Sequence, residues 1–379
     1  MANSYLSRSG STPTNSKKFT YSFWVKRSTL SADQAILSYE TDSANRGGIE
    51  LQTGEQFRYF ERVSNSTTVF VEPSRLFRDP AAWYHIVVAT DTTQSTEADR
   101  VKIYVNGVQE TDFASTPTYP ALNSDTRANG STVKNIGRRN VNNDYYFDGY
   151  LSHVSFVDGS ALAPTVFGQT DSTSGIWKFK SPSGVTWGNN GFHLKFENSG
   201  ALGTDSSGNS NTFTVNGNLK QSLDTPSNNH STINGLFRSR FLNQATLTNA
   251  NLTMTTGPTD GDKALLLGTQ GVTKGKWYWE CKVGADRSMI GFAYDSISRF
   301  SDFYGSNSPS DGFSVYGNNG NVYYDGSNTA YGSTWTTNDI IMVALDMDNK
   351  LAWLGKNGTW MNSATQTEIE NGTATNDLT

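Results

Sequence analysis

Cysteine and histidine are rare in this chain, which has one cysteine, Cys281, and four histidines in 379 residues. A single cysteine excludes an internal disulfide and any metal site built from several thiolates. The histidines are His85, His153, His193 and His230, and none of them forms a His-x-x-x-His pair. We therefore expect packing roles for Cys281 and for the histidines within strands, and no nucleophilic catalysis.

Charged residues are also few, at 17% of the chain, with 30 Lys and Arg against 35 Asp and Glu and a formal net charge of -5. No basic run is present to meet a phosphate backbone, so nucleic-acid binding is not expected. No apolar run approaches the ~18 residues of a membrane span, and the first residues contain no apolar signal segment. We expect a soluble chain without membrane insertion.

The motifs of common hydrolases are missing from the sequence. Neither Glu-x-Asp-x-Glu nor Glu-x-Asp-x-x-Glu occurs, and no Gly-x-Ser-x-Gly elbow is found. Asp346 and Asp348 share one strand face, but they adjoin the stretch Lys350–Gly358, where turn chemistry accounts for them. The sequence therefore predicts a protein that is not an enzyme, with a hydrolase of another arrangement as an alternative.

Aromatic residues and glycine are plentiful, with 20 Phe, 17 Tyr, 9 Trp and 35 Gly. The stretches Phe77–Ala89 and Arg100–Gly107 are echoed by Gly275–Val283 and Lys350–Gly358. In both halves an aromatic-led strand is followed by an aliphatic strand that runs into Asn-Gly, the dipeptide that favours a type I′ hairpin turn. No segment keeps a 3.6-residue apolar period. The sequence predicts two all-β domains in tandem.

The order of strands in the first half resembles the laminin G-like domains of the concanavalin A-like, pentraxin-type family. The resemblance covers about residues 1 to 165 and rests on Tyr21–Lys26, Trp83–Val88, Val101–Gly107, Ile136–Arg138 and Phe147–Phe156. It implies an antiparallel, jelly-roll-like β-sandwich. His153 stands where the family usually has an acidic residue, so no role of that acid is carried over.

The second half resembles the SPRY domain, a β-sandwich that acts as a binding module. The resemblance rests on Gly275–Glu280, Ile290–Ala293, Asp311–Val315, Asp339–Asp348 and Leu351–Trp360. Only 19 residues follow Trp360, so this domain is either short or continues beyond Thr379. We expect a first sandwich at 1–222 with a C-terminal extension, a polar linker at 223–236 and a SPRY-like sandwich at 237–379.

The two domains together are similar to structural proteins of marine bacteriophages, in which such sandwiches occur along fibres and surface appendages. This resemblance implies a virion location, other virion proteins and a host-surface glycan or protein as partners, and a homo-oligomer. A secreted or cell-surface adhesin or lectin is the alternative function. A polysaccharide-active enzyme is a third.

Rim loops rich in aromatic and amide side chains are candidates for ligand binding, because sugars stack on rings while amides and carboxylates bind hydroxyls. The candidates are Asp144, Tyr145 and Tyr146 in the first domain and Tyr304, Tyr331 and Trp335 in the second. Packing within the sheets is the competing interpretation for each cluster.

One polar loop is also a candidate calcium site. The stretch Asp205–Asn211 offers oxygen ligands, with Asp205 and Asn209 as candidates, and hard Ca²⁺ prefers such ligands. An ordinary turn has the same composition, since Asn, Asp, Ser and Gly supply left-handed geometry and local hydrogen bonds. Both interpretations stay open at this point.

Overall fold

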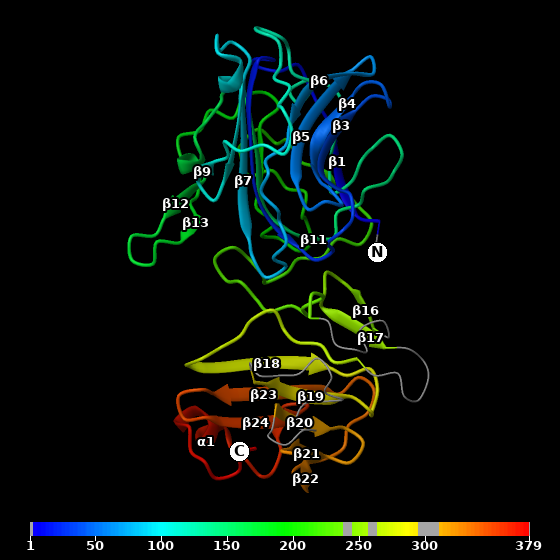
Figure 1. The fold of residues 1–379 in the computed structure, drawn as a ribbon, viewed down its shortest axis with the longest axis vertical. Coiled ribbons are helices and arrows are strands. Elements are labelled where there is room, and N and C mark those ends of the chain that lie inside the picture. Colours follow the sequence, from blue (N-terminus) through cyan, green and yellow to red (C-terminus); the bar gives the residue numbers. More distant parts are fainter. Residues whose placement is uncertain (1–2, 238–244, 257–263, 295–310, 379) are drawn as a thin grey trace. The chain divides into compact units, whose positions relative to one another are not determined.

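The computed structural model describes residues 3–237, 245–256, 264–294 and 311–378. The chain forms two compact units, Met1–Ser231 and Thr232–Thr379. The predicted linker, 223–236, spans this division, and its first part up to Ser231 belongs to the first unit. Sheets dominate both units (Figure 1), which confirms the all-β prediction. Within the described residues, no helix is long and apolar enough to cross a membrane.

The first unit contains two antiparallel sheets. The seven-stranded sheet has the order β15 (Thr214–Asn216), β1 (Tyr5–Ser9), β10 (Val133–Ile136), β3 (Gln34–Glu40), β4 (Arg46–Leu51), β5 (Phe57–Val63), β6 (Ser66–Val71). The six-stranded sheet has the order β14 (Phe192–Leu194), β11 (Gly149–Asp158), β2 (Lys18–Arg27), β7 (Tyr84–Asp91), β8 (Val101–Val105), β9 (Val108–Gln109). Short 3₁₀ turns lie at Glu97–Asp99 and Pro164–Val166.

The core of the first unit lies between these sheets. Alternation along β2 places Phe19, Tyr21 and Phe23 on one face, and all three are fully buried. Rings from β5 meet them, with centroids 6.1 Å apart for Phe19 and Tyr59 and 6.5 Å apart for Phe23 and Phe57. Burial of such large rings from both inner faces supplies most of the hydrophobic stabilisation of a sandwich.

A hairpin covers part of the outer face of the six-stranded sheet. It consists of β12 (Gly168–Thr170) and β13 (Trp177–Phe179). Trp177 donates from Nε1 to Nδ1 of His85 at 2.9 Å, and Ser22 Oγ lies 2.9 Å from His85 Nε2. His153 stacks on Phe179, with centroids 3.5 Å apart. The predicted structural role of His85 and His153 is therefore confirmed.

The second unit contains two four-stranded antiparallel sheets and a separate hairpin. One sheet has the order β18 (Lys276–Lys282), β23 (Ile340–Asp346), β24 (Leu351–Lys356), β25 (Thr359–Trp360). The other has the order β19 (Met289–Ala293), β20 (Gly312–Tyr316), β21 (Asn321–Tyr324), β22 (Ser327–Ala330). The hairpin pairs β16 (Ala245–Thr248) with β17 (Thr253–Thr256), and one helix, α1 (Gln366–Asn371), begins after a capping box at Thr365.

Cys281 lies in β18 and is half-buried, and burial raises the pKa of its thiol. A raised pKa lowers the thiolate fraction, so this cysteine is a poor nucleophile at neutral pH.

Candidate functional site

A polar cluster lies on the outer face of the seven-stranded sheet, under the connection between β10 and β11. Ile136 of β10 packs in the core, so alternation turns its neighbour Asn135 to the outer face. Asn135 is paired with Ser7 of β1 and Ser38 of β3. We call this surface the outer-face cluster; it comprises these residues with Tyr5, Glu40, Glu50 and residues 138–146.

A guanidinium separates two buried carboxylates in the outer-face cluster. Arg139 Nη2 lies 3.2 Å from Glu50 Oε1, and Arg139 Nε lies 3.6 Å from Glu40 Oε1. Glu40 also accepts from the backbone N–H of Val141 at 2.7 Å, and Glu50 accepts from Arg58 Nη2 at 2.6 Å. Glu40 and Glu50 are 2% and 1% exposed. These bonds hold the loop against the sheet.

The pKa directions in the cluster follow from burial and pairing. Burial raises the pKa of Glu40, and the N–H of Val141 and the charge of Arg139 only partly oppose this shift. Burial acts to lower the pKa of Arg139, but Glu50, Tyr145 and Glu40 outweigh burial and the net shift is upward. Arg139 is therefore a fixed positive charge in this site.

Two arginine-tyrosine stacks form the upper layer of the outer-face cluster. The Arg139 Cζ atom lies 3.9 Å from the ring centroid of Tyr145, and the Arg138 Cζ atom lies 3.5 Å from that of Tyr5. The Tyr5 and Tyr146 ring centroids are 6.4 Å apart. Tyr145 has a φ of 51° and accepts from the backbone N–H of Ala35 at 2.8 Å. Charge and ring face attract each other, so these stacks orient half-exposed aromatic surfaces.

Several buried polar atoms of this cluster have no hydrogen-bond partner among the described residues. They are both side-chain amide atoms of Asn135, Oδ1 of Asp144 and Nε of Arg138. Asn135 is 0% exposed. Buried polar groups are almost always satisfied in folded proteins, so a group of orphans in one place indicates that water or a ligand binds there.

The structure brings together the three candidates of the first unit. Asp144, Tyr145 and Tyr146 lie in one loop, where the backbone O of Asp144 accepts from Arg139 N at 3.0 Å. Sequence reasoning missed Asn135, Glu40 and Glu50. Their only signal was a polar residue at an alternate strand position, which normally marks a solvent-facing side chain.

The candidates of the second unit require a correction. Tyr331 and Trp335 are 7% and 1% exposed and belong to the core. The Tyr331 hydroxyl accepts from the backbone N–H of Leu354 at 3.2 Å, and Trp335 donates to Ser288 Oγ at 2.9 Å. Their rings are thus packed in the core, and Tyr331 also lines an open hollow beside β22. Tyr304 lies outside the described residues.

The Asp205 loop is saturated by its own hydrogen bonds. Oδ1 of Asp205 accepts from the backbone N–H groups of His193 and Ser207 at 2.9 and 2.8 Å. Oδ2 accepts from the Ser207 hydroxyl and from Asn211 N, both at 2.8 Å. Asn209 donates a hydrogen bond from Nδ2 to the backbone O of Gly188 at 2.6 Å. Within the described residues, no group of three or more His, Cys, Asp or Glu is placed to hold a metal ion.

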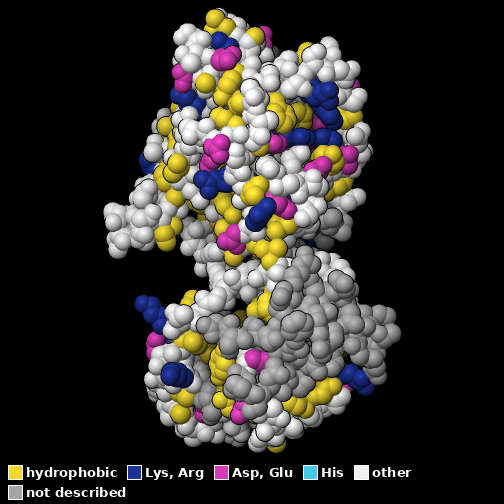
Figure 2. Space-filling view, in the orientation of Figure 1, with side chains coloured by type: hydrophobic (Ala, Val, Ile, Leu, Met, Phe, Trp, Pro, Cys, Tyr) yellow, Lys and Arg dark blue, Asp and Glu magenta, His cyan; other side chains and the backbone are white. Residues whose placement is uncertain are grey.

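Two open hollows lie at the surface of the second unit. Their volumes are about 340 and 490 Å³, and they lie beside β22 and β25 respectively. None of the described residues that line them has a buried polar atom without a partner. We therefore place the candidate site at the outer-face cluster, where Figure 2 shows Lys and Arg side chains mixed with Asp and Glu side chains over the region of β3 to β5.

Comparison with known families agrees with this architecture. Residues 2–166 match the model of the concanavalin A-like lectin/glucanases superfamily, and residues 276–373 match the SPRY domain. The chain carries a concanavalin A-like domain and a SPRY domain. The first match ends at the 3₁₀ turn Pro164–Val166, so residues 167–231 extend the concanavalin A-like domain within the same compact unit.

Several solved structures are similar to this chain at low identity. A heptameric SAP-like pentraxin from Limulus polyphemus is 14% identical, covers 42% of this chain and 71% of its own, and has a TM-score of 0.32. The CBM40 domain of the Ruminococcus gnavus IT-sialidase is 13% identical, with coverages of 40% and 80% and a TM-score of 0.29.

Domains LG4-5 of the mouse laminin α1 chain are 10% identical, with coverages of 95% and 74% and a TM-score of 0.35. No curated protein sequence matches the chain.

Proposed function

We propose that this protein is a bacteriophage virion structural protein, in a tail fibre, spike or capsid-surface appendage, and that its outer-face cluster binds saccharides of the host surface. The observation that carries the binding role is the pair of arginine-tyrosine stacks, which present half-exposed rings in the same loop as Asp144, whose Oδ1 has no partner among the described residues. A carboxylate oxygen accepts hydrogen bonds from sugar hydroxyls, and half-exposed rings suit the C–H face of a sugar.

The charge arrangement favours binding over hydrolysis. A glycosidase needs one carboxyl that gives up a proton and a second that is free to attack or to activate water. Glu50 is held by Arg58 and Arg139, and Glu40 is held by Arg139 and the backbone of Val141. Neither carboxylate is therefore free to attack a substrate or to activate water. We therefore propose a protein that is not an enzyme.

The virion location rests on the resemblance of the domain pair to phage appendage proteins. A secreted or cell-surface adhesin or lectin would use the same cluster, so the binding site does not distinguish the two locations of the protein. Mass spectrometry of purified phage particles separates the two, because a virion protein copurifies with particles through a density gradient. We also propose a homo-oligomer, and a solution mass of 41.5 kDa by light scattering would contradict it.

Binding is tested on a panel of bacterial polysaccharides, with the same mixtures assayed for released sugar ends. We expect saturable binding without cleavage, and a loss of about tenfold or more in affinity for Asp144→Ala and Tyr145→Ala, because each removes a polar or stacking partner. Asp171→Ala is the matched control, since this acidic residue lies in the β12–β13 hairpin on the other sheet.

Calcium is not part of this proposal, because both Asp205 oxygens already accept two hydrogen bonds each. The same binding assay with a chelator added tests whether calcium is required. Loss of binding on chelation would restore a calcium role, and release of sugar ends would overturn the non-enzymatic assignment.

A further inference from the structure

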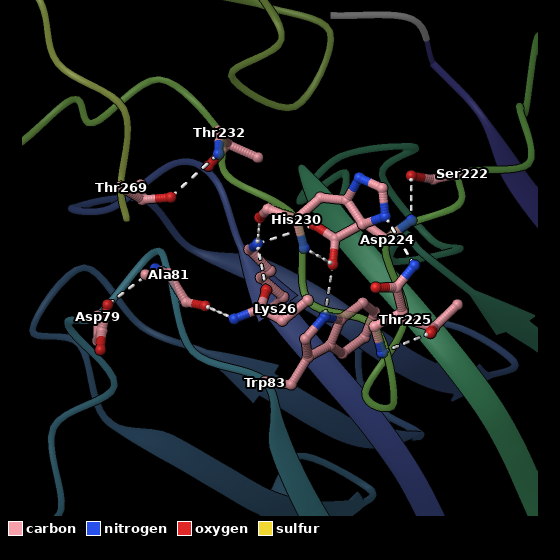
Figure 3. A network of polar contacts seen from close by, with 12 residues as sticks. Lys26, Asp79, Ala81, Trp83, Ser222, Asp224, Thr225, His230, Thr232 and Thr269 are labelled. Atoms are coloured by element: carbon pink, nitrogen blue, oxygen red, sulfur yellow. Dashed lines mark hydrogen bonds and ion pairs between the residues drawn. The ribbon is translucent and has the colours of Figure 1, made fainter. Parts of the chain in front are cut away.

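The last residues of the first unit return to the six-stranded sheet and cover a buried lysine. Lys26 lies on β2 opposite Tyr150 of β11 and is 0% exposed. Alternation with the core residue Val25 turns its side chain to the outer face of this sheet. Residues 224–230 close over the ammonium group, as Figure 3 shows for Asp224 and His230.

The ammonium group has three oxygen partners at equal distances. Lys26 Nζ lies 2.8 Å from Asp224 Oδ2, 2.8 Å from the side-chain Oδ1 of Asn229 and 2.8 Å from the backbone O of His230. The amine, a carboxylate and a side-chain amide therefore meet at one atom.

The carboxylate and the amide are each held in one orientation. Asp224 Oδ1 accepts from Trp83 Nε1 at 2.8 Å, which leaves Oδ2 directed at Lys26 (Figure 3). Asn229 donates from Nδ2 to the backbone O of Ala81 at 2.8 Å, which leaves its carbonyl end directed at Lys26. Fixed groups in contact react as if at a very high concentration.

The ion pair is removed from water, since Lys26 is 0% exposed and Asp224 is 6% exposed. Trp83 and Tyr150, which are 9% and 8% exposed, form apolar walls beside the pair. A desolvated neutral lysine is a nucleophile, and a neighbouring neutral carboxylic acid is a general acid.

We propose that Lys26 and Asn229 join in an intramolecular isopeptide bond, with Asp224 as the proton carrier. Asp224 takes a proton from Nζ, and the Nζ lone pair attacks Cγ of Asn229. The Cγ–Nζ bond forms and the Cγ–Nδ2 bond breaks. Two protons pass from Nζ to Nδ2 through Asp224, so ammonium leaves, one proton stays on the new amide and the carboxylate is regenerated. No oxidant or reductant is needed.

The bond would tie β2 to the segment that directly precedes the division at Ser231. Tension applied from Thr232 onward would then reach β2 through a covalent bond, and residues 224–229 would not peel from the sheet. This role is independent of saccharide binding, so either proposal can fail alone.

The test is the mass and the peptide map of the purified full-length protein. We expect an intact mass lower than the sequence mass by one ammonia molecule, and a tryptic species in which Phe19–Arg27 is joined to Gln221–Arg238. A succinimide at asparagine also loses ammonia, but it leaves those two peptides separate. Two separate peptides, with cleavage after Lys26, would overturn the proposal.

Variants identify the reacting groups. Lys26→Arg and Asp224→Ala should each restore the full mass and remove the joined species. Lys134→Arg is the matched control, because Lys134 is also buried, at 1% exposed, but its Nζ donates to the backbone O of Gly130 at 2.7 Å. The joined species should persist in that variant. Its presence in Asp224→Ala at the wild-type level would exclude Asp224 as the proton carrier.

Discussion

Each unit contains an Asn-Gly hairpin turn, and the two turns have the same geometry. Asn106 and Asn357 have φ values of 48° and 51°, and the glycines that follow have 81° and 84°. Asn106 N donates to His85 O and its Oδ1 accepts from His85 N, both at 2.8 Å. Asn357 N donates to Ile340 O at 2.9 Å, and its Oδ1 accepts from Ile340 N at 2.8 Å. The asparagine thus bonds twice to the neighbouring strand in each unit.

The units differ in what they bury. The first buries many charged side chains, including Lys26, Glu40, Glu50 and Arg139, whereas the buried charged residues of the described part of the second are Asp311 and Asp346. Buried charges tolerate few rearrangements, because each loses its hydration and needs a specific partner. A shared hairpin therefore does not imply shared chemistry, and both proposed activities lie in the first unit.

The largest effect is expected where a buried pair of the first unit is broken. Glu50→Ala leaves Arg139 buried with a weaker partner set, so the first unit should lose about 3–5 kcal/mol of unfolding free energy. Hydrogen exchange read separately for each unit, with denaturant titration, gives the value. Unchanged protection of the first unit would show that the buried charges matter less than we argue.

Acid should also distinguish the units, because all four histidines lie in the first. Burial lowers the pKa of His85 to about 3, and that of His153 and His193 to about 4. The unfolded chain therefore binds more protons between those values and about 6.5, so the stability these residues contribute is complete above pH 6.5 and is lost as the pH falls.

We expect the three histidines together to cost the first unit on the order of 4–5 kcal/mol between pH 6.5 and 5. The raised pKa of Glu40 and Glu61 acts in the opposite direction, since these groups bind protons more readily in the folded state. The test is hydrogen exchange measured in each unit as a function of pH. An equal dependence of unfolding free energy on pH in both units would contradict the histidine assignment.

The two hairpins should respond alike to the same substitution. Asn106→Ala removes the bond that Oδ1 accepts from His85 N, and Asn357→Ala removes the equivalent bond from Ile340 N together with an exposed bond from Nδ2 to Asp339 Oδ1 at 2.7 Å. Both variants place alanine at a positive φ, so each should destabilise its own unit by about 1–2 kcal/mol. Thermal or denaturant unfolding of the two variants measures this. A large difference between them would show that the surroundings of the turn decide its cost.

The smallest effect is expected for Lys276→Ala in the second unit. Lys276 Nζ lies 3.4 Å from Asp346 Oδ2, but the lysine side chain is 48% exposed. Exposed pairs contribute about 0–1 kcal/mol, and Asp346 keeps its bonds from Asn349. This variant is the control for Glu50→Ala, and a loss similar to that of Glu50→Ala would remove the distinction between the units.

Local signals in the sequence predicted the fold well. Asn-Gly requires two positive φ angles, and both predicted hairpins are confirmed by Asn106 and Asn357. Strand alternation also separated core from surface along β2, because neighbouring positions face opposite sides of a sheet.

The site could be predicted only in part. Tyr145 and Tyr146 do belong to the outer-face cluster, but Trp335 in a similar polar setting is a core residue. Sequence alternation shows that Glu50 faces away from the core, yet it cannot show that Arg139, 89 positions away, covers it. Burial of that kind depends on the long-range arrangement of a loop.

The two turn glycines also differ in the space around them. A side chain at Gly107 would meet the ring of Trp177 at 2.4 Å, whereas no atom of the described residues lies within 4 Å of the corresponding position at Gly358. The first turn is therefore enclosed by its own domain. A residue that tolerates a positive φ, such as asparagine, would clash at the first turn but would find room at the second.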